Sequence, residues 1–127
     1  MHDYKAHARS NYFEIKDLKA FEDAMPDDVE IRKCARRVAV HSRCGESGAW
    51  PTWNRRTNQE IDIPAIVSEH LVDGNVAIFM EAGASVSSYV VGHAEAINSK
   101  GERREVSLGE IYRMAEQLGN DFTRVED

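Results

Sequence analysis

The sequence contains few cysteines, the residues that cross-link small secreted domains, and it has no long apolar run of the kind that spans a membrane. Two cysteines, Cys34 and Cys44, and three prolines stand among 127 residues. No apolar run approaches the roughly 18 residues that a membrane-spanning helix needs, and residues 1–10 lack the apolar stretch of a secretory signal peptide. We therefore expect a cytoplasmic protein that makes no membrane contact and keeps both cysteines as free thiols.

Motifs for catalysis and for cofactors are also missing. The sequence has no glycine-rich phosphate loop and no nucleophile elbow, so we expect no cofactor and assign no catalytic residue. One alternative stays open, a small enzyme or metal protein around His41 and His93. His93 and Glu95 lie two apart on an expected strand, share one face, and can transfer protons or hold a metal. A strand histidine is more often structural, and we assign no metal site.

The charges are unevenly distributed along the chain. The net charge is −6, and 127 residues with 42% hydrophobic content suit a single globular domain. Residues 32–56 contain seven basic side chains and one acidic side chain, whereas residues 1–31 and 57–127 are both acidic. A basic centre between acidic ends is the main electrostatic feature of the sequence.

The hydrophobic patterns predict an α+β domain that has a mostly antiparallel sheet and about three helices. Residues 1–10 are polar and aperiodic, which indicates a flexible N-terminal tail ahead of a single domain over residues 11–127. Strands are expected at residues 12–15, and at 29–32 and 36–42 as a hairpin.

Two helices are expected in the first part of this domain. Asp17 is a suitable N-cap for a short helix that ends at Pro26. Residues 61–71 have apolar side chains at helical spacing, and Pro64 is acceptable in the first turn.

The strongest pattern lies between residues 74 and 119. Alternation over Val76–Glu81 and again over Tyr89–Asn98 predicts a strand pair, joined by a turn at Ala82–Ser85. A second turn at Ser99–Glu102 is expected to follow.

A helix is expected after this strand pair. Ser107 and Glu110 form a capping-box pattern, with Val106 and Ile111 as the hydrophobic staple. Further apolar residues recur at helical spacing up to Gly119, and Phe122–Val125 is expected to add a last short strand. The apolar face predicted for the helix consists of Leu108, Ile111, Ala115 and Leu118.

The least regular segment, residues 45–56, holds the best candidates for binding. Tryptophan and arginine are enriched at binding hot spots, and we expect Trp53, which polar residues follow, to be more exposed than Trp50. In the alternative interpretation both indoles fold back and close the open end of the sheet. The predicted partner-binding residues are Trp50, Trp53, Arg55, Arg56, Arg36, Arg37 and Arg43.

Two classes of partner fit this basic and aromatic set. If its arginines contacted phosphates and its indoles stacked on bases, the region 32–56 would bind nucleic acid. A pI near 5.4 and the lack of a nucleic-acid-binding motif favour a protein partner. The 13 carboxylates of residues 57–127 are dispersed among apolar positions, which is typical of a solvated surface. We therefore expect a non-enzymatic protein-binding module.

Several stretches resemble small uncharacterised proteins carried on bacterial plasmids and phages. Residues 10–17 (SNYFEIKD) and 74–102, with the segments VAIFMEAG and YVVG, carry the likeness. The segment Ala49-Trp50-Pro51 is similar to a Gly-Trp-Pro element of those proteins. The resemblance brings no catalytic residues with it. It implies an accessory protein of a mobile genetic element, a class in which inhibitors of restriction and CRISPR defences are common.

Overall fold

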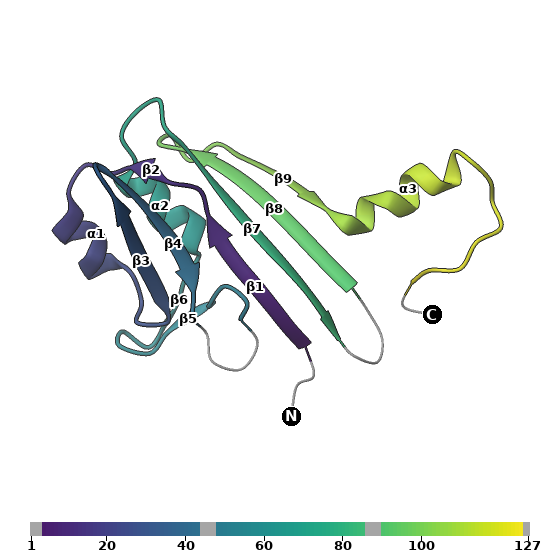
Figure 1. The fold of residues 1–127 in the computed structure, drawn as a ribbon, viewed down its shortest axis with the longest axis horizontal. Coiled ribbons are helices and arrows are strands. Elements are labelled where there is room, and N and C mark those ends of the chain that lie inside the picture. Colours follow the sequence, from purple (N-terminus) through teal and green to yellow (C-terminus); the bar gives the residue numbers. More distant parts are fainter. Residues whose placement is uncertain (1–3, 44–47, 86–89, 126–127) are drawn as a thin grey trace.

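The computed structural model describes residues 4–43, 48–85 and 90–125, which contain nine strands and three α-helices (Figure 1). The strands are β1 Tyr4–Ser10, β2 Phe13–Glu14, β3 Val29–Cys34, β4 Arg37–Ser42, β5 Trp53–Asn54, β6 Gln59–Glu60, β7 Val76–Ser85, β8 Val90–Asn98 and β9 Arg103–Ser107. The helices are α1 Leu18–Ala24, α2 Ile63–His70 and α3 Ile111–Glu116, the last preceded by a 3-10 turn, η1 Leu108–Glu110. The predicted α+β class is confirmed.

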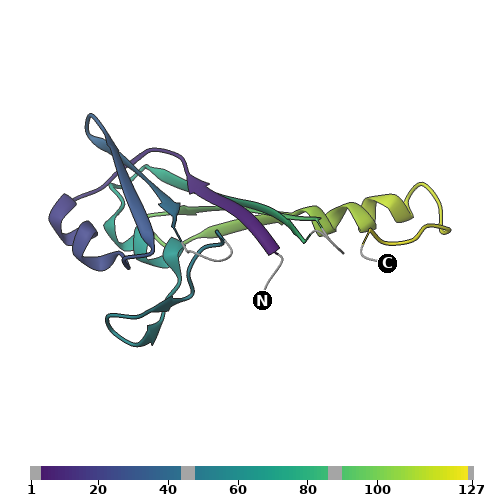
Figure 2. The ribbon, with the colours of Figure 1, turned by 60° about the horizontal axis from the view of Figure 1, so that its bottom comes forward.

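Seven of the strands form one antiparallel sheet. Its order is β3, β4, β1, β7, β8, β9. The short β2 also pairs with β4, next to β1 and on the edge of β4 opposite to β3. The strands β5 and β6 form a separate ribbon. Helices α1 and α2 and this ribbon lie on one side of the sheet, whereas α3 extends outward beyond the sheet (Figure 2). We call the side that carries the helices the inner face and the opposite side the outer face.

Both helices on the inner face begin at an aspartate, as predicted for α1. Asp17 accepts a hydrogen bond from the Ala20 N–H at 3.2 Å, and Asp62 accepts one from the Ala65 N–H at 3.4 Å. Each bond satisfies an N–H group that the start of a helix leaves without a partner. Pro64 stands in the first turn of α2, where an N–H is not needed.

The core fills the space between the sheet and these two helices. Phe21 and Met25 from α1 and its end, and Val67 from α2, pack with the sheet residues Phe13 and Val40. The rings of Phe13 and Phe21 meet edge to face with their centroids 6.1 Å apart. Because each buried side chain of this kind contributes about 1.5–3 kcal/mol, the half of the sheet beneath the helices holds the fold together.

The first strand corrects the expectation of a flexible tail over residues 1–10. Residues Tyr4–Ser10 form β1, which lies between β4 and β7 and pairs with β7 along its whole length. The residues that face inward are small, so the strand does not show the alternation of large apolar and polar side chains by which strands are predicted. The buried residues are Ala6, Ala8 and Ser10, and the exposed residues are Lys5, His7 and Arg9.

The predicted strand pair in the C-terminal half is confirmed, with a longer first strand. β7 pairs with β8 from Val76 opposite Asn98 to Ala84 opposite Val90, so the turn expected at Ala82–Ser85 is wrong. Continued pairing to β1 and β8 keeps these small residues extended. The predicted strand residue Tyr89 lies outside the described residues.

The helix start predicted after this pair is wrong in detail. Ser107 ends β9, opposite His93, and its side chain makes no capping hydrogen bond to Glu110 or its neighbours. Pairing with β8 extends the chain up to Ser107 and delays α3. The predicted last strand, Phe122–Val125, is irregular instead, because the chain after α3 has left the sheet (Figure 1).

Candidate functional site

The loop that carries both tryptophans folds back onto the sheet. Gly48 lies so close to β1 that a Cβ added to it would stand 2.0 Å from the Ala6 carbonyl oxygen. Trp50 packs edge to face on Phe79, with ring centroids 5.7 Å apart, and contacts the core. Trp53 is 47% exposed, so the prediction that it is the more exposed indole is confirmed. Trp50 therefore anchors the loop and is partly buried, whereas Trp53 is exposed.

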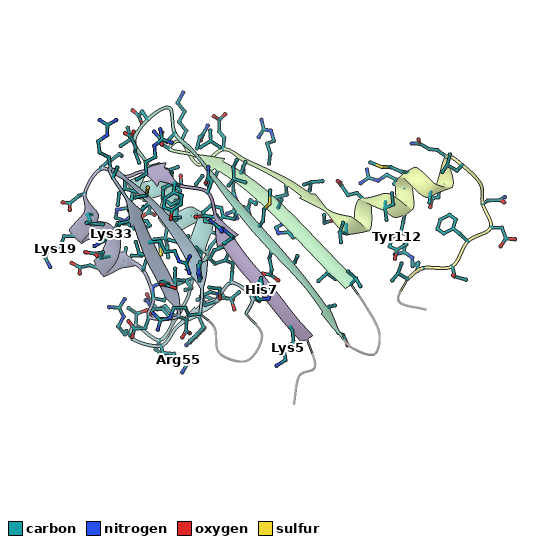
Figure 3. All side chains as sticks on the ribbon, viewed as in Figure 1. Lys5, His7, Lys19, Lys33, Arg55 and Tyr112 are labelled. Carbon is teal, nitrogen blue, oxygen red and sulfur yellow. The ribbon has the colours of Figure 1, made fainter. Side chains whose placement is uncertain are left out.

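The predicted arginines do not form one surface, because two of them stand at the turn between β3 and β4. Arg36 and Arg37 each have a guanidinium nitrogen 3.9 Å from the Glu14 carboxylate. Lys33 marks this end of the β3–β4 hairpin in Figure 3, while Arg55 marks the opposite end.

The other three arginines gather around the segment that enters β3. Arg55 lies 3.6 Å from Asp28, and Arg56 lies 3.6 Å from Asp27. The Arg43 N–H donates to the Asp28 carbonyl at 2.6 Å. Carboxylates therefore offset the charge of Arg55 and Arg56, which weakens this group as a site for an acidic partner.

The structure does not bring His41 and His93 together. His41 on β4 is paired with Arg9, which is exposed on the outer face. His93 on β8 is paired with Glu81, which is paired in turn with the buried Ala8 on the inner face. Directly paired residues share a face, and β1 and β7 stand between the two histidines.

His93 belongs instead to a pocket on the inner face. Its Nε2 lies 2.9 Å from Glu105 Oε1, and the neighbouring Glu95 is only 6% exposed. The Arg103 guanidinium contacts the Glu95 carboxylate and lies 2.6 Å from that of Asp62. The hydrogen bonds that Arg103 donates, first to Asp62 and then to Glu95, raise the pKa of Arg103 above its ordinary value, against the effect of burial. Apolar residues complete the lining: Trp50, Ile61, Pro64 and Phe79.

Among the described residues, His93, Glu95 and Glu105 form the group that could hold a metal ion. Their ligand atoms lie within 4.8 Å of one another, and imidazole with carboxylates is a donor set that divalent cations accept. Both carboxylates already have partners within the protein, Arg103 for Glu95 and His93 for Glu105. Arg103 and Glu105 are not among the residues predicted for this site, because no strand is expected over Arg103–Ser107.

The outer face carries a strip of exposed apolar side chains. The strand register aligns Arg9, Met80, Ala94 and Val106 across β1, β7, β8 and β9, and these side chains therefore share the outer face. Large exposed apolar patches on a soluble protein mark interaction sites. The strip consists of Val76, Ile78, Met80, Val90 and Val106.

A groove crosses this strip over β7, β8 and β9. Gly92 permits its shape, because a Cβ at that position would stand 3.1 Å from the Leu108 side chain. Leu108 can therefore lie close against the sheet. The floor of this outer groove is Ala82, Gly92 and Ala94, and its walls are Met80, Val106, Leu108, His7 and Arg9.

Basic side chains flank the outer groove. Lys5 and Arg9 stand on β1, with Lys5 near His7 along the strand (Figure 3), and Arg104 faces outward from β9 opposite Ala96. Further along the same face, the pKa of His41 is lowered from its ordinary value by burial first and then by Arg32, with Arg9 and Arg43 adding to the shift and Glu30 opposing it. The acidic chain therefore presents a basic outer face.

Comparison with protein families, with curated proteins and with solved structures found no match to this chain. Of the helices in the described part of the chain, none combines the length and the hydropathy that crossing a membrane requires. The molecule's own surface is therefore what supports a functional assignment.

Proposed function

We propose that the protein is a non-enzymatic protein-binding module whose docking surface is the outer groove with the apolar strip around it. The composition of β7 supports this most directly. Val76, Ile78 and Met80 on its outer face are as apolar as Ala77 and Phe79 on its inner face. Strands that are apolar on both faces are typical of sheets that are covered on both sides. Within the described structure, helices cover only the inner side.

The total exposed surface area also supports a partner that covers the outer face of the sheet. The chain exposes 8704 Å², which is about 1,900 Å² more than the roughly 6,800 Å² expected for a compact monomer of 14.3 kDa. Each partner in a standard protein interface buries about 800 Å². The excess is therefore large enough to contain a complete interface.

The charges favour a partner that is acidic around an apolar centre. Lys5, Arg9 and Arg104 flank the groove although the whole chain has a net charge of −6. Complementary charge would orient such a partner and speed its association. Nucleic acid is a weaker fit, because the outward-facing side chains described on these strands include no Phe, Tyr or Trp on which bases could stack.

The resemblance to plasmid and phage accessory proteins directs the search for this partner to a bacterial host. An accessory protein of that class acts on host components, so restriction and CRISPR defence proteins are the first to test. An acidic surface around an apolar centre is the property to look for among them.

Affinity capture from a bacterial lysate tests the docking surface when wild type is compared with two variants. Met80→Lys places a charge in the groove wall, and Trp53→Ala removes the exposed indole of the tryptophan loop. Both side chains are exposed, at 57% and 47%, so both variants should keep the wild-type Tm. We expect Met80→Lys to lose the partner and Trp53→Ala to retain it.

The captured protein, once purified, should bind Met80→Lys at least tenfold more weakly than wild type in calorimetry. Equal binding by Met80→Lys would exclude the outer groove. Binding lost only in Trp53→Ala would assign the contact to the tryptophan loop.

A further inference from the structure

The C-terminal segment, residues 108–125, is the least covered part of the described chain. Leu108, Ile111, Met114 and Leu118 are 54–93% exposed and follow one another at helical spacing. None of the six residues of α3 is buried. So short a helix is unstable alone in water and takes its stability from packing of its apolar side. Apart from Leu108, which lies against Gly92, the segment is therefore little covered by the described part of its own chain.

We infer that the segment packs against the outer groove of a second copy of the chain. In the resulting dimer, the C-terminal segment of each copy covers the outer groove of the other. The inference rests on the proposed function, since it names an occupant for the same docking surface.

The two surfaces are complementary in charge and in polarity. Residues 108–127 contain five acidic and two basic side chains, and Arg113 is already 3.2 Å from Glu110 within the segment. The groove offers the opposite charge through Lys5, Arg9 and Arg104. Its floor of alanine and glycine leaves room for the larger side chains of the segment. A partner with acidic and apolar chemistry is therefore present in the chain itself.

The same residues also form one continuous surface, as a symmetric dimer requires. Leu108 is both a wall of the groove and the first apolar residue of the segment. Leu108 also lines a second apolar pocket together with Val90 and Ile111, so the apolar surface continues from the groove into the segment. A two-fold axis beside Leu108 would place each segment on the partner's groove, and each copy would contribute the same patch.

The area agrees with a stable dimer. The two copies together have an excess of about 3,800 Å² over compact monomers, and obligate homodimers bury about 2,000–5,000 Å² in total. A reciprocal arrangement forms the same contact twice, so an interface in this range needs about 1,000 Å² or more from each contact.

Sedimentation equilibrium of the full chain over a hundredfold dilution series tests the inference. Met80→Glu alters the groove and Met114→Glu alters the segment. Leu18→Glu is the matched control, because Leu18 is 38% exposed on α1 and belongs neither to the groove nor to the apolar strip. We expect wild type and Leu18→Glu to sediment at twice 14.3 kDa, and the two methionine variants to sediment at 14.3 kDa.

Mixing the two monomeric variants tests reciprocity. The Met80→Glu copy keeps an intact segment, and the Met114→Glu copy keeps an intact groove, so the mixture should recover a dimer through one of the two contacts. Its dissociation constant should be weaker than that of wild type by at least tenfold. If the two variants fail to associate on mixing, the segment does not bind the groove.

A wild-type chain that stays at 14.3 kDa at every concentration would overturn the dimer, as would a dimer that survives Met80→Glu. The proposed function would still stand in either case if capture of a partner depended on Met80. Conversely, suppose that Met80→Glu and Met114→Glu each disrupt the dimer but that Met80→Lys still captures the partner from the lysate. That result would refute the proposed function and leave the dimer standing.

Discussion

Trp50 and Trp53 are three positions apart in one loop, yet only Trp50 packs on the core. Its ring meets Phe79 edge to face at 5.7 Å, whereas Trp53 is 47% exposed. Trp50→Ala should lower the free energy of unfolding by about 2–4 kcal/mol, since it removes a large side chain from a packed contact. Trp53→Ala should change it by about 0.5 kcal/mol or less.

Urea unfolding of both variants measures this difference, and iodide quenching of the remaining indole supports it. The indole left in Trp50→Ala should be quenched readily, and the one left in Trp53→Ala should be protected. Comparable losses of stability, with neither indole quenched, would instead indicate that both rings close the end of the sheet.

His41 should give the protein part of its pH dependence. Burial and the nearby Arg32 hold the pKa of His41 below the ordinary 6.5 in the folded chain. As the pH falls below that value, the unfolded chain binds more protons than the folded chain, and the free energy of unfolding therefore decreases. The contribution of His41 is complete above the unfolded pKa and is lost as the pH falls through the folded pKa.

His41→Gln should remove this part of the pH dependence. Urea unfolding between about pH 7.5 and about pH 5 should show a smaller loss of stability in the variant than in wild type. Carboxylates away from His41 contribute equally to both proteins, so the difference between the two curves reports on His41 together with Glu30, which lies 3.6 Å from it. Parallel curves across this range would show that His41 titrates alike in the folded and unfolded chains.

At the scale of elements, β1 is the strand whose removal should matter most. It lies between β4 and β7, and Tyr4–Ser10 pair with β7 without a gap. Deletion of residues 1–10 would leave two sets of backbone groups unpaired and expose the inner side of the sheet, so we expect the shortened chain not to fold. Deletion of residues 119–127 is the control and should leave the fold intact.

Circular dichroism and thermal unfolding compare the two deletions. The chain without residues 1–10 should show no cooperative transition, while the control should retain one near the wild-type Tm. A cooperative transition in both would restore the interpretation of residues 1–10 as a tail.

The elements that the sequence predicts well are those in which large apolar side chains recur at the regular spacing of a strand or of a helix. Val76 to Met80 and the helix around Val67 were predicted because apolar residues recur at the spacing of a strand or a helix. β1 was missed because alanine and serine face inward. β9 was missed because Arg103, Arg104 and Glu105 show no apolar alternation and Val106-Ser107 matches a helix start, so only the pairing with β8 makes the segment a strand.

The candidate site was harder to predict than the fold. The sequence favours binding by the tryptophan loop, residues 45–56, because tryptophan and arginine beside glycine and proline are typical of contact loops. The signal for the outer groove was present in Val76, Ile78 and Met80, which alternate with the equally apolar Ala77 and Phe79. A strand that is apolar on both faces predicts a cover on each side of the sheet, but its sequence does not identify what provides the second cover.

At the scale of the whole molecule, the sheet separates charges that are interleaved in the sequence. The outer face carries Lys5, Arg9 and Arg104, while the inner pocket holds Glu95 and Asp62 around Arg103. The net charge of −6 hides this division, because the strand period sends neighbouring residues to opposite sides. An acidic protein can in this way offer a basic docking surface.

The least stable part of the molecule should be α3, and its stability should depend on association. Six helical residues with no buried side chain open at little cost in free energy. The strands β1, β7 and β8 should exchange their amide hydrogens only through global unfolding. In the dimer, packing of Ile111 and Met114 against the other copy should protect the α3 amides by at least tenfold more than in a monomer.

Hydrogen exchange measured by mass spectrometry, on wild type and on Met80→Glu, tests this coupling. Met80 is on β7 and not in α3, so the variant leaves the helix sequence unchanged. Faster exchange in α3 together with unchanged exchange in β1 would show that the groove stabilises a helix in another copy. Equal exchange of α3 in both proteins would mean that the helix gains nothing from the groove.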